Sequence, residues 1–150
     1  MIYAVFAVLL LIDRITKIWA NLWLSEKGPI NFIKGILGFT YVENRGVAFG
    51  MLSDKLYIVL PVTIVVVIIC VCVYIKNRGK SKLFDTSLLF VITGAIGNIA
   101  DKITRGFVVD FIEFRFIDFP VFNFADIYVC IGAALLIIYV LFGENNENRV

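Results

Sequence analysis

Four long apolar runs, separated by more polar segments, dominate the pattern of hydrophobic and polar positions along this chain. Each run can cross a hydrocarbon core of roughly 30 Å as an α-helix, because a helix rises about 1.5 Å per residue. The sequence therefore predicts an all-α integral membrane protein, formed by one membrane-embedded domain over residues 1–150. Its four transmembrane helices are expected at Ile2–Leu24, Leu56–Ile75, Phe84–Arg105 and Phe124–Phe142.

The first apolar run is expected to be retained as a helix. It has no basic segment before it, and Asp13, Arg14 and Lys17 follow its apolar start. A cleaved secretory signal has a basic start and a cleavage site of small residues. The pattern here therefore favours a transmembrane helix over a signal peptide.

The connection between the second and third runs suggests how the helices are oriented. It holds a dense basic cluster without any acid: Lys76, Arg78, Lys80 and Lys82. Such clusters mark cytoplasmic loops. The other two connections together carry more Lys and Arg, but these are spread out and mixed with acids. If this basic cluster marks the cytoplasmic side of the membrane, both termini are cytoplasmic. The segments Ser25–Lys55 and Gly106–Asn123 then face outward.

The two outward segments differ from ordinary loops. Gly38–Glu43 is typical of a short strand, and Asn44-Arg45-Gly46 after it is typical of a turn. Phe107–Phe124 contains seven phenylalanines, a density that suits a membrane interface. Non-helical backbone at that depth must be covered by protein or line a wet cavity. We expect a small extracytoplasmic β platform on the outer leaflet.

Composition narrows the possible functions. Hydrophobic residues make up 61% of the chain, aromatic residues 15%, and the net charge is +2. These values exclude a soluble domain and give no indication of a nucleic-acid partner. The chain has no histidine, and its cysteines, Cys70, Cys72 and Cys130, lie in apolar runs and are interpreted as small core residues. No metal or other cofactor is expected, membrane lipid is an expected partner, and nothing requires an obligate oligomer.

Four aspartates stand out because they lie inside or beside the apolar runs: Asp13, Asp101, Asp110 and Asp126. A charged side chain at the centre of a bilayer costs roughly 2.5–3.5 kcal/mol on insertion scales, so such residues pair, bind or react. With the predicted topology, all but Asp13 gather at the outer end of the bundle. Without histidine, these carboxylates are the main candidates for chemistry.

Two of the acids have plausible structural roles. Asp13 and Lys17 are four residues apart on one helix face, which favours an ion pair that makes both charges tolerable in lipid. A site-shaping role for this pair stays open. Gly94, Asn98 and Asp101 share one helix stripe, suitable for close helix packing and interhelical hydrogen bonds. Arg105, four residues after Asp101, is expected to neutralise it.

The remaining two acids suit a catalytic pair. Asn123 and Asp126 fit the N-cap and N3 positions of the fourth helix, which is consistent with capping alone. The same position puts Asp126 at the positive end of a helix dipole. Asp110 sits between Val109 and Phe111 with no adjacent base. Two carboxylates in such different settings can share a proton, one activating a water and the other protonating the leaving group.

Five sequence blocks, in order, carry a family resemblance: Asp13-Arg-Ile-Thr-Lys17, Asn44-Arg-Gly46-Val-Ala-Phe49, Gly94-Ala-Ile-Gly-Asn98-Ile-Ala-Asp101, Val108-Val-Asp110-Phe111 and Phe122-Asn123-Phe-Ala125-Asp126. Together they resemble the blocks of lipoprotein signal peptidase, the type II signal peptidase of bacteria. The resemblance covers nearly the whole chain.

The resemblance implies a four-helix aspartyl endopeptidase of the bacterial cytoplasmic membrane, with its active site toward the outer face. It would remove signal peptides from prolipoproteins, cutting before the diacylglyceryl-modified cysteine. The family's catalytic aspartates match Asp110 and Asp126. Its supporting or substrate-binding positions match Asp13, Lys17, Asn44, Gly46, Asn98, Asp101, Lys102, Asn123 and Ala125. Lys102 stands where the family commonly has arginine, and it lacks the planar fork of that side chain.

Two other classes of function remain. Intramembrane acids also mark proton relays in small transporters, although these acids crowd one side and no inverted repeat is visible. Alternatively, the acids could be capped and paired residues of a non-catalytic assembly module. A Ser–Lys protease is a weaker idea, because neither Ser25 nor Ser53 has a lysine at helical spacing to act as its base.

Overall fold

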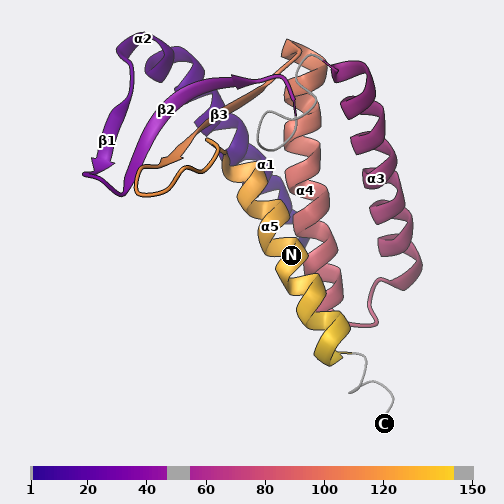
Figure 1. The fold of residues 1–150 in the computed structure, drawn as a ribbon. Coiled ribbons are helices and arrows are strands. Elements are labelled where there is room, and N and C mark those ends of the chain that lie inside the picture. The colour runs from indigo at the N-terminus through magenta and orange to yellow at the C-terminus, as the bar shows by residue number, and fades with distance from the viewer. Residues whose placement is uncertain (1, 47–54, 144–150) are drawn as a thin grey trace.

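A bundle of long helices with a small sheet at one end makes up the protein (Figure 1). The structure, a computed structural model, describes residues 2–46 and 55–143. The long helices are α1 (Ile2–Trp19), α3 (Leu56–Asn77), α4 (Lys82–Arg105) and α5 (Phe124–Ile138). They agree closely with the four predicted helices.

Two of the helices continue beyond their regular α-helical part. α1 passes through a π-helical turn, η1 (Ala20–Leu24), into the short α2 (Ser25–Lys27), and α5 continues into a second π turn, η3 (Tyr139–Gly143). Nothing in the apolar pattern predicted these π turns. In η1, the buried Ala20 and Leu24 pack against the buried residues of β3, so this π turn contributes to the apolar core beneath the sheet.

Three helices of the described residues are long and apolar enough to cross a membrane: Leu56–Asn77, Lys82–Arg105 and Phe124–Phe142. They carry large hydrophobic side chains on their outer faces, such as Val62 and Ile137. α1 has a similar outer surface but includes three charged residues, Asp13, Arg14 and Lys17. The protein is therefore mostly helical and membrane-embedded.

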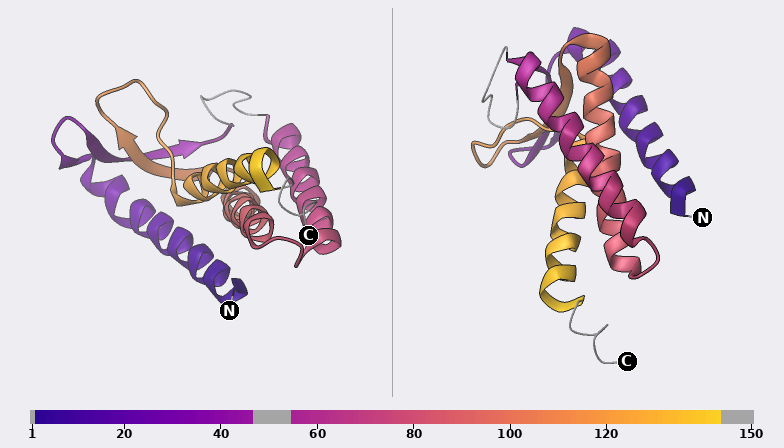
Figure 2. Two further views of the ribbon diagram at one scale, coloured as in Figure 1. Left: turned by 90° about the horizontal axis from the view of Figure 1, so that it is seen from below. Right: turned by 90° about the vertical axis from the view of Figure 1, so that its right-hand side faces the viewer.

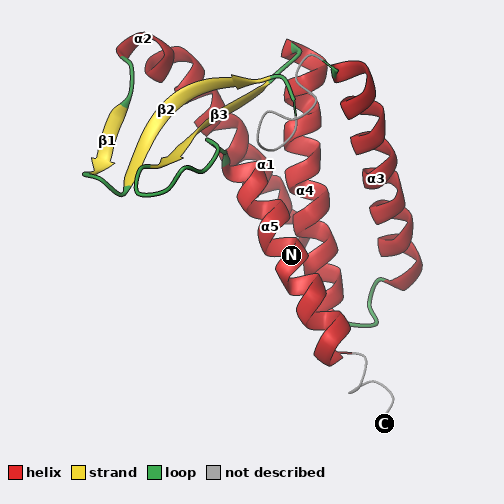
Figure 3. Ribbon diagram, in the orientation of Figure 1, coloured by secondary structure: helices red, strands yellow, loops and turns green. Residues whose placement is uncertain are grey.

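The sheet is antiparallel, with the order β1-β2-β3 (Figure 3). Its strands are β1 (Ile30–Ile33), β2 (Leu37–Asn44) and β3 (Val108–Phe114). The expected strand at Gly38–Glu43 is confirmed as the middle of β2, whereas β1 and β3 were not predicted as strands. In the β2–β3 register, Val42 lies opposite Asp110, which fixes where β3 presents this acid.

α4 is the central helix and packs against α5, α3 and α1 (Figure 2). Glycine allows α4 and α5 to approach closely, because a Cβ atom on Gly132 of α5 would lie 2.6 Å from the carbonyl oxygen of Ser87 on α4. Away from the sheet, the core is formed by Phe6, Tyr74, Leu88, Leu89 and Ile92. Of the cysteines expected in the core, Cys72 and Cys130 are instead exposed on helix surfaces.

The chain reverses direction sharply after α4. Gly106 caps α4 with a φ of 80°, the left-handed conformation that glycine adopts without steric cost. The next residues enter β3, so Asp110 comes back over the end of the bundle. The α3–α4 connection and the end of α5 lie at the opposite end of the bundle from the sheet (Figures 1 and 2).

Candidate active site

Asn123 joins the two aspartates that the sequence singled out as a pair. It is fully buried and caps the N-terminus of α5. Its side-chain Nδ2 donates to Asp110 Oδ1 at 2.5 Å, and its Oδ1 accepts from the backbone N–H of Asp126 at 3.2 Å. The backbone N–H of Asn123 donates to Asp126 Oδ2 at 3.1 Å, which completes the predicted capping box. One asparagine therefore contacts both acids.

All four carboxylate oxygens of Asp110 and Asp126 accept a hydrogen bond. Besides the bonds from Asn123, Asn44 Nδ2 donates to Asp110 Oδ2 at 2.8 Å, and Asn98 Nδ2 donates to Asp126 Oδ1 at 2.8 Å. The donors come from β2, α4 and the start of α5. Three separate parts of the fold must therefore meet before either acid has its partners.

The side-chain amides of Asn44 and Asn98 are held in one orientation by neighbouring groups that can only donate a hydrogen bond. Asn44 Oδ1 accepts the backbone N–H of Gly46 at 3.0 Å. Asn98 Oδ1 accepts from Lys17 Nζ at 2.9 Å. Because each oxygen is held this way, each NH₂ group must face a carboxylate, which removes the usual ambiguity between the O and N atoms of an amide.

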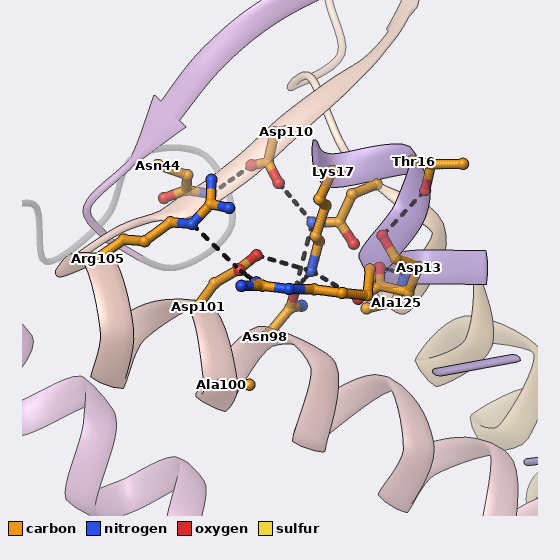
Figure 4. Close-up of polar contacts among 12 residues, drawn as sticks. Asp13, Thr16, Lys17, Asn44, Asn98, Ala100, Asp101, Arg105, Asp110 and Ala125 are labelled. Carbon is orange, nitrogen blue, oxygen red and sulfur yellow. Dashed lines mark hydrogen bonds and ion pairs between the residues drawn. The ribbon is translucent and has the colours of Figure 1, made fainter. Parts of the chain in front are cut away.

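Lys17 is the centre of a buried charged cluster beside the aspartate pair (Figure 4). Its ammonium lies 3.0 Å from Asp13 Oδ2 and 3.1 Å from Asp101 Oδ2. The i,i+4 pair of Asp13 and Lys17 is thus present, and Lys17 also links α1 to α4. Asp101 also pairs with Arg14, at 2.8 Å, whereas the expected partner Arg105 is more distant, at 3.9 Å. Arg14 was missed because it lies on another helix.

Asp13 also connects α1 to the start of α5. Its Oδ1 accepts the backbone N–H of Ala125 at 3.0 Å. Gly97 of α4 leaves the space for this contact, because a Cβ there would lie 2.6 Å from Asp13 Oδ2. Asp13 therefore satisfies one of the free N–H groups at the N-terminus of α5, next to the residues that hold Asp110 and Asp126.

The environment of Asp110 favours its protonated form. Burial, followed by the charge of Asp126, raises the pKa of Asp110 to about 7, while hydrogen bonds from Asn44 and Asn123 and the charge of Lys17 act in the opposite direction. Its side chain is 2% exposed, and no cation within the described residues forms an ion pair with it. A carboxyl group that titrates near neutral pH suits acid–base chemistry.

Lys102 is a predicted site residue whose ammonium stands apart from the hydrogen-bonded network of the other polar side chains. It is buried, one helical turn beyond Asn98 on α4, and its electrostatic partners include Asp126 and Asp110. Within the described ranges its side chain makes neither a hydrogen bond nor an ion pair, and its backbone carbonyl accepts the N–H of Gly106. Gly46 is buried beside Asn44, whereas Ala48 and Phe49 of the same sequence block lie outside the described residues.

The structure brings the predicted site residues to one end of the bundle. Asp126 and Asn98 keep partial exposure, so a water or substrate atom can reach this side of the pair. Within the described residues, no group of three or more cysteine or acidic side chains is placed to hold a metal ion. A cavity of about 490 Å³ lies elsewhere, on the sheet, and is lined by Thr40, Glu113 and Arg115 among others.

Comparisons with known proteins agree on one family. The sequence profile of signal peptidase II matches residues 5–142. A lipoprotein signal peptidase of Clostridium tetani is 40% identical over 143 residues, which cover 93% of this chain and 92% of the relative. The lipoprotein signal peptidase of Clostridioides difficile is 38% identical and covers 98% of this chain and 99% of its own length.

The fold matches solved structures as well. A bacterial membrane enzyme with 29% sequence identity superposes with a TM-score of 0.89, covering 99% of this chain and 90% of that one. A second bacterial membrane enzyme, 30% identical, gives a TM-score of 0.85 with 93% and 92% coverage. Sequence and fold agree over nearly the whole length, and the chain belongs to the signal peptidase II family.

Proposed function

We propose that this protein is an intramembrane aspartic endopeptidase that removes the signal peptide from diacylglyceryl-modified bacterial prolipoproteins, cutting before the lipid-modified cysteine. Its relatives named lipoprotein signal peptidase support the substrate class. The observation that carries the proposal is the sharing of the Asn123 amide between Asp110 and the capping box of Asp126. Two carboxylates on different elements thus face one small polar site.

The two acids have different roles because their surroundings differ. Asp126 lies at the N-terminus of α5 and accepts a backbone N–H, so the helix dipole stabilises its ionised form. Asp110 lies on β3 among apolar neighbours, and its raised pKa keeps a large fraction protonated at neutral pH. In the resting enzyme, Asp126 is the base and Asp110 is the acid.

Hydrolysis then proceeds in two steps. Asp126 takes a proton from a water, whose oxygen attacks the scissile carbonyl carbon, while Asp110 gives its proton to the carbonyl oxygen. This forms a gem-diol. The C–N bond then breaks as Asp126 gives its proton to the departing nitrogen and a gem-diol hydroxyl returns a proton to Asp110. Both acids end in their starting states.

The substrate reaches this site from the membrane. The outer faces of α1 and α5 carry exposed apolar side chains, including Leu11, Ile15 and Ile131, against which the two acyl chains and membrane lipid are placed. The Phe-rich segment after β3 lies at the same end as the aspartates. Asn44, which is partly exposed, is the candidate contact for the peptide backbone. Asn123 was expected to be a second contact, but it is fully buried and its amide is already bonded to Asp110 and Asp126.

A fourth transmembrane helix completes the proposed topology in the bacterial cytoplasmic membrane. Residues 2–24 are continuously helical, about 34 Å at the ordinary rise per residue. The charges of α1 are offset by the ion pair between Asp13 and Lys17 and by the ion pair between Arg14 and Asp101. Both termini and the basic α3–α4 connection are assigned to the cytoplasm, and the sheet with the aspartate pair to the outer face. The α3–α4 connection lies at the opposite end of the bundle from the sheet (Figure 1), which supports this assignment.

The non-catalytic assembly module explains only some of the contacts. Capping accounts for Asp126, and ion pairing accounts for Asp13 and Asp101. Asp110 caps no helix, and the described residues supply it with no ion pair, although it is buried. The placement of this one acid favours chemistry over assembly.

A cleavage assay tests the proposal directly. Purified wild type, Asp110→Asn and Asp126→Asn are each incubated with a diacylglyceryl-modified prolipoprotein, and release of the signal peptide is followed by mass spectrometry. We expect cleavage by the wild type and loss of at least 10³-fold in kcat for either variant, in the range reported for catalytic residues. The exposed Asp118→Asn variant is the matched control. Near-normal turnover by either active-site variant would refute the assignment of the pair.

A further inference from the structure

Lys17 is close to the aspartate pair without touching either acid. It is fully buried, and its ammonium has three partners: Asp13 Oδ2, Asp101 Oδ2 and Asn98 Oδ1. The first two contacts are ion pairs, and they are enough to neutralise a lysine in a membrane helix. The third is a hydrogen bond of 2.9 Å to the amide that contacts Asp126.

The contact with Asn98 has a direction. An ammonium can only donate, so Asn98 Oδ1 must face Lys17 and Asn98 Nδ2 must face Asp126 Oδ1. Asn123 Nδ2 reinforces this orientation through a longer contact of 3.3 Å to Asn98 Oδ1. Rotating the amide by half a turn would place oxygen against Asp126 and NH₂ against the ammonium.

The charge of Lys17 also affects the strength of the next bond. Charge-assisted hydrogen bonds are about twice as strong as neutral ones, and hydrogen bonds in a chain polarise one another. The Asn98 amide, with a cation on its oxygen, becomes a better donor to the carboxylate of Asp126. Because Asn98 is only partly buried, it needs an anchor to keep this position.

We propose that Lys17 is a positioning residue of the peptidase, which acts on the reaction through Asn98 by holding its amide against Asp126. The ion pairs with Asp13 and Asp101 are then the support that fixes the ammonium in place. Figure 4 shows Lys17 between Asn98 and the two acids of this support. The inference rests on the proposed function, because it assigns Lys17 a role in the reaction of Asp126.

A double-mutant cycle on the full-length enzyme separates positioning from structure. The cycle uses the wild-type sequence as its background, so that both ion pairs of Lys17 and the contact of Asp13 with the Ala125 N–H are present in the reference protein. The four proteins of the cycle are this background, Lys17→Met, Asn98→Ala and the double change. A synthetic diacylglyceryl-modified prolipoprotein peptide is the substrate, and kcat and KM are measured separately.

If Lys17 acts through Asn98, Lys17→Met lowers kcat by on the order of 10–100-fold, with KM changed less than about threefold, as for a displaced catalytic contact. In the Asn98→Ala background, the same change lowers kcat less than about threefold, because the anchored amide is already absent. Equal losses in both backgrounds, or an unchanged kcat, would overturn the proposal.

Folding is checked by circular dichroism and by the unfolding midpoint in detergent. Lys17→Gln is the second variant, since it remains polar but lacks a charge, and it is expected to show the same loss of kcat. If both replacements prevent folding, Lys17 is a structural residue and the proposal is rejected. Failure of the proposed function would be seen separately, as unchanged turnover in Asp110→Asn and Asp126→Asn under the same conditions.

Discussion

The buried carboxyl of Asp110 gives a quantitative prediction about stability. Its pKa is raised from 3.8 to about 7 in the folded protein, mainly by burial. An acid with a raised pKa stabilises the fold at low pH, and this contribution is lost as the pH rises through about 7. Between pH 5 and pH 9, this one group should lower the free energy of unfolding by about 3 kcal/mol, at about 1.4 kcal/mol for each pH unit between 5 and 7.

Replacing Asp110 with asparagine removes the titration while keeping the size of the side chain. Asn44 and Asn123 both donate to Asp110, but an asparagine at this position has only one acceptor oxygen. We expect a cost of about 1–3 kcal/mol for the donor left without a partner, independent of pH. The variant should therefore be less stable than the wild type at pH 5 and of similar or higher stability at pH 9.

The measurement is reversible unfolding by SDS titration in detergent micelles at pH 5, 7 and 9, followed by the helical circular dichroism signal. The quantity of interest is the difference in unfolding free energy between the wild type and Asp110→Asn at each pH. Asp118→Asn makes the same change at an exposed position and controls for the loss of one charge. A difference that stays constant from pH 5 to pH 9 would show that Asp110 does not titrate near 7.

Three further predictions concern the surroundings of the pair. Asn44→Ala removes a hydrogen bond that lowers the pKa of Asp110, so the alkaline limb of the kcat profile should move to higher pH; an unmoved limb contradicts this role. Gly132→Ala places a Cβ 2.6 Å from the Ser87 carbonyl oxygen and should cost about 1–3 kcal/mol of stability by SDS unfolding, with KM unchanged; wild-type stability would refute the close contact. Lys102→Arg keeps the positive charge near Asp110 and should retain activity within about tenfold, whereas Lys102→Met should lose about 10²-fold in cleavage rate; equal rates would exclude an electrostatic role.

The helices could be predicted from the sequence because a helix forms its backbone hydrogen bonds within its own segment. The length and apolar composition of each run are also visible in the sequence. The same holds for the cap of α5, since Asn123 and Asp126 are three residues apart and form a local motif. The Asp13–Lys17 pair is equally local, at one helical turn. These features depend on neighbours along the chain, which the sequence displays directly.

The sheet was only partly predictable. β2 was recognised from its own residues, but β1 and β3 take their partners from distant parts of the chain. From Val108 to Ile112, β3 is buried at every position, so it lacks the alternation that marks a half-exposed strand. Both faces of β3 are buried because α1, η1 and α5 pack against the strand. The sequence of the strand does not reveal these packing partners.

The sequence by itself determined which residues are candidates for chemistry: an apolar chain without histidine leaves buried aspartates as its reactive groups, and the ordered blocks around them carry the family resemblance. The tertiary structure alone decided how these groups are connected. Asn123 reaches Asp110, Lys17 reaches Asn98, and Arg14 reaches Asp101 across gaps of 13 to 87 residues in sequence. Hydrogen bonds and ion pairs act over about 3 Å in space, and only the packing of α1, α4, α5 and β3 brings their atoms to that distance.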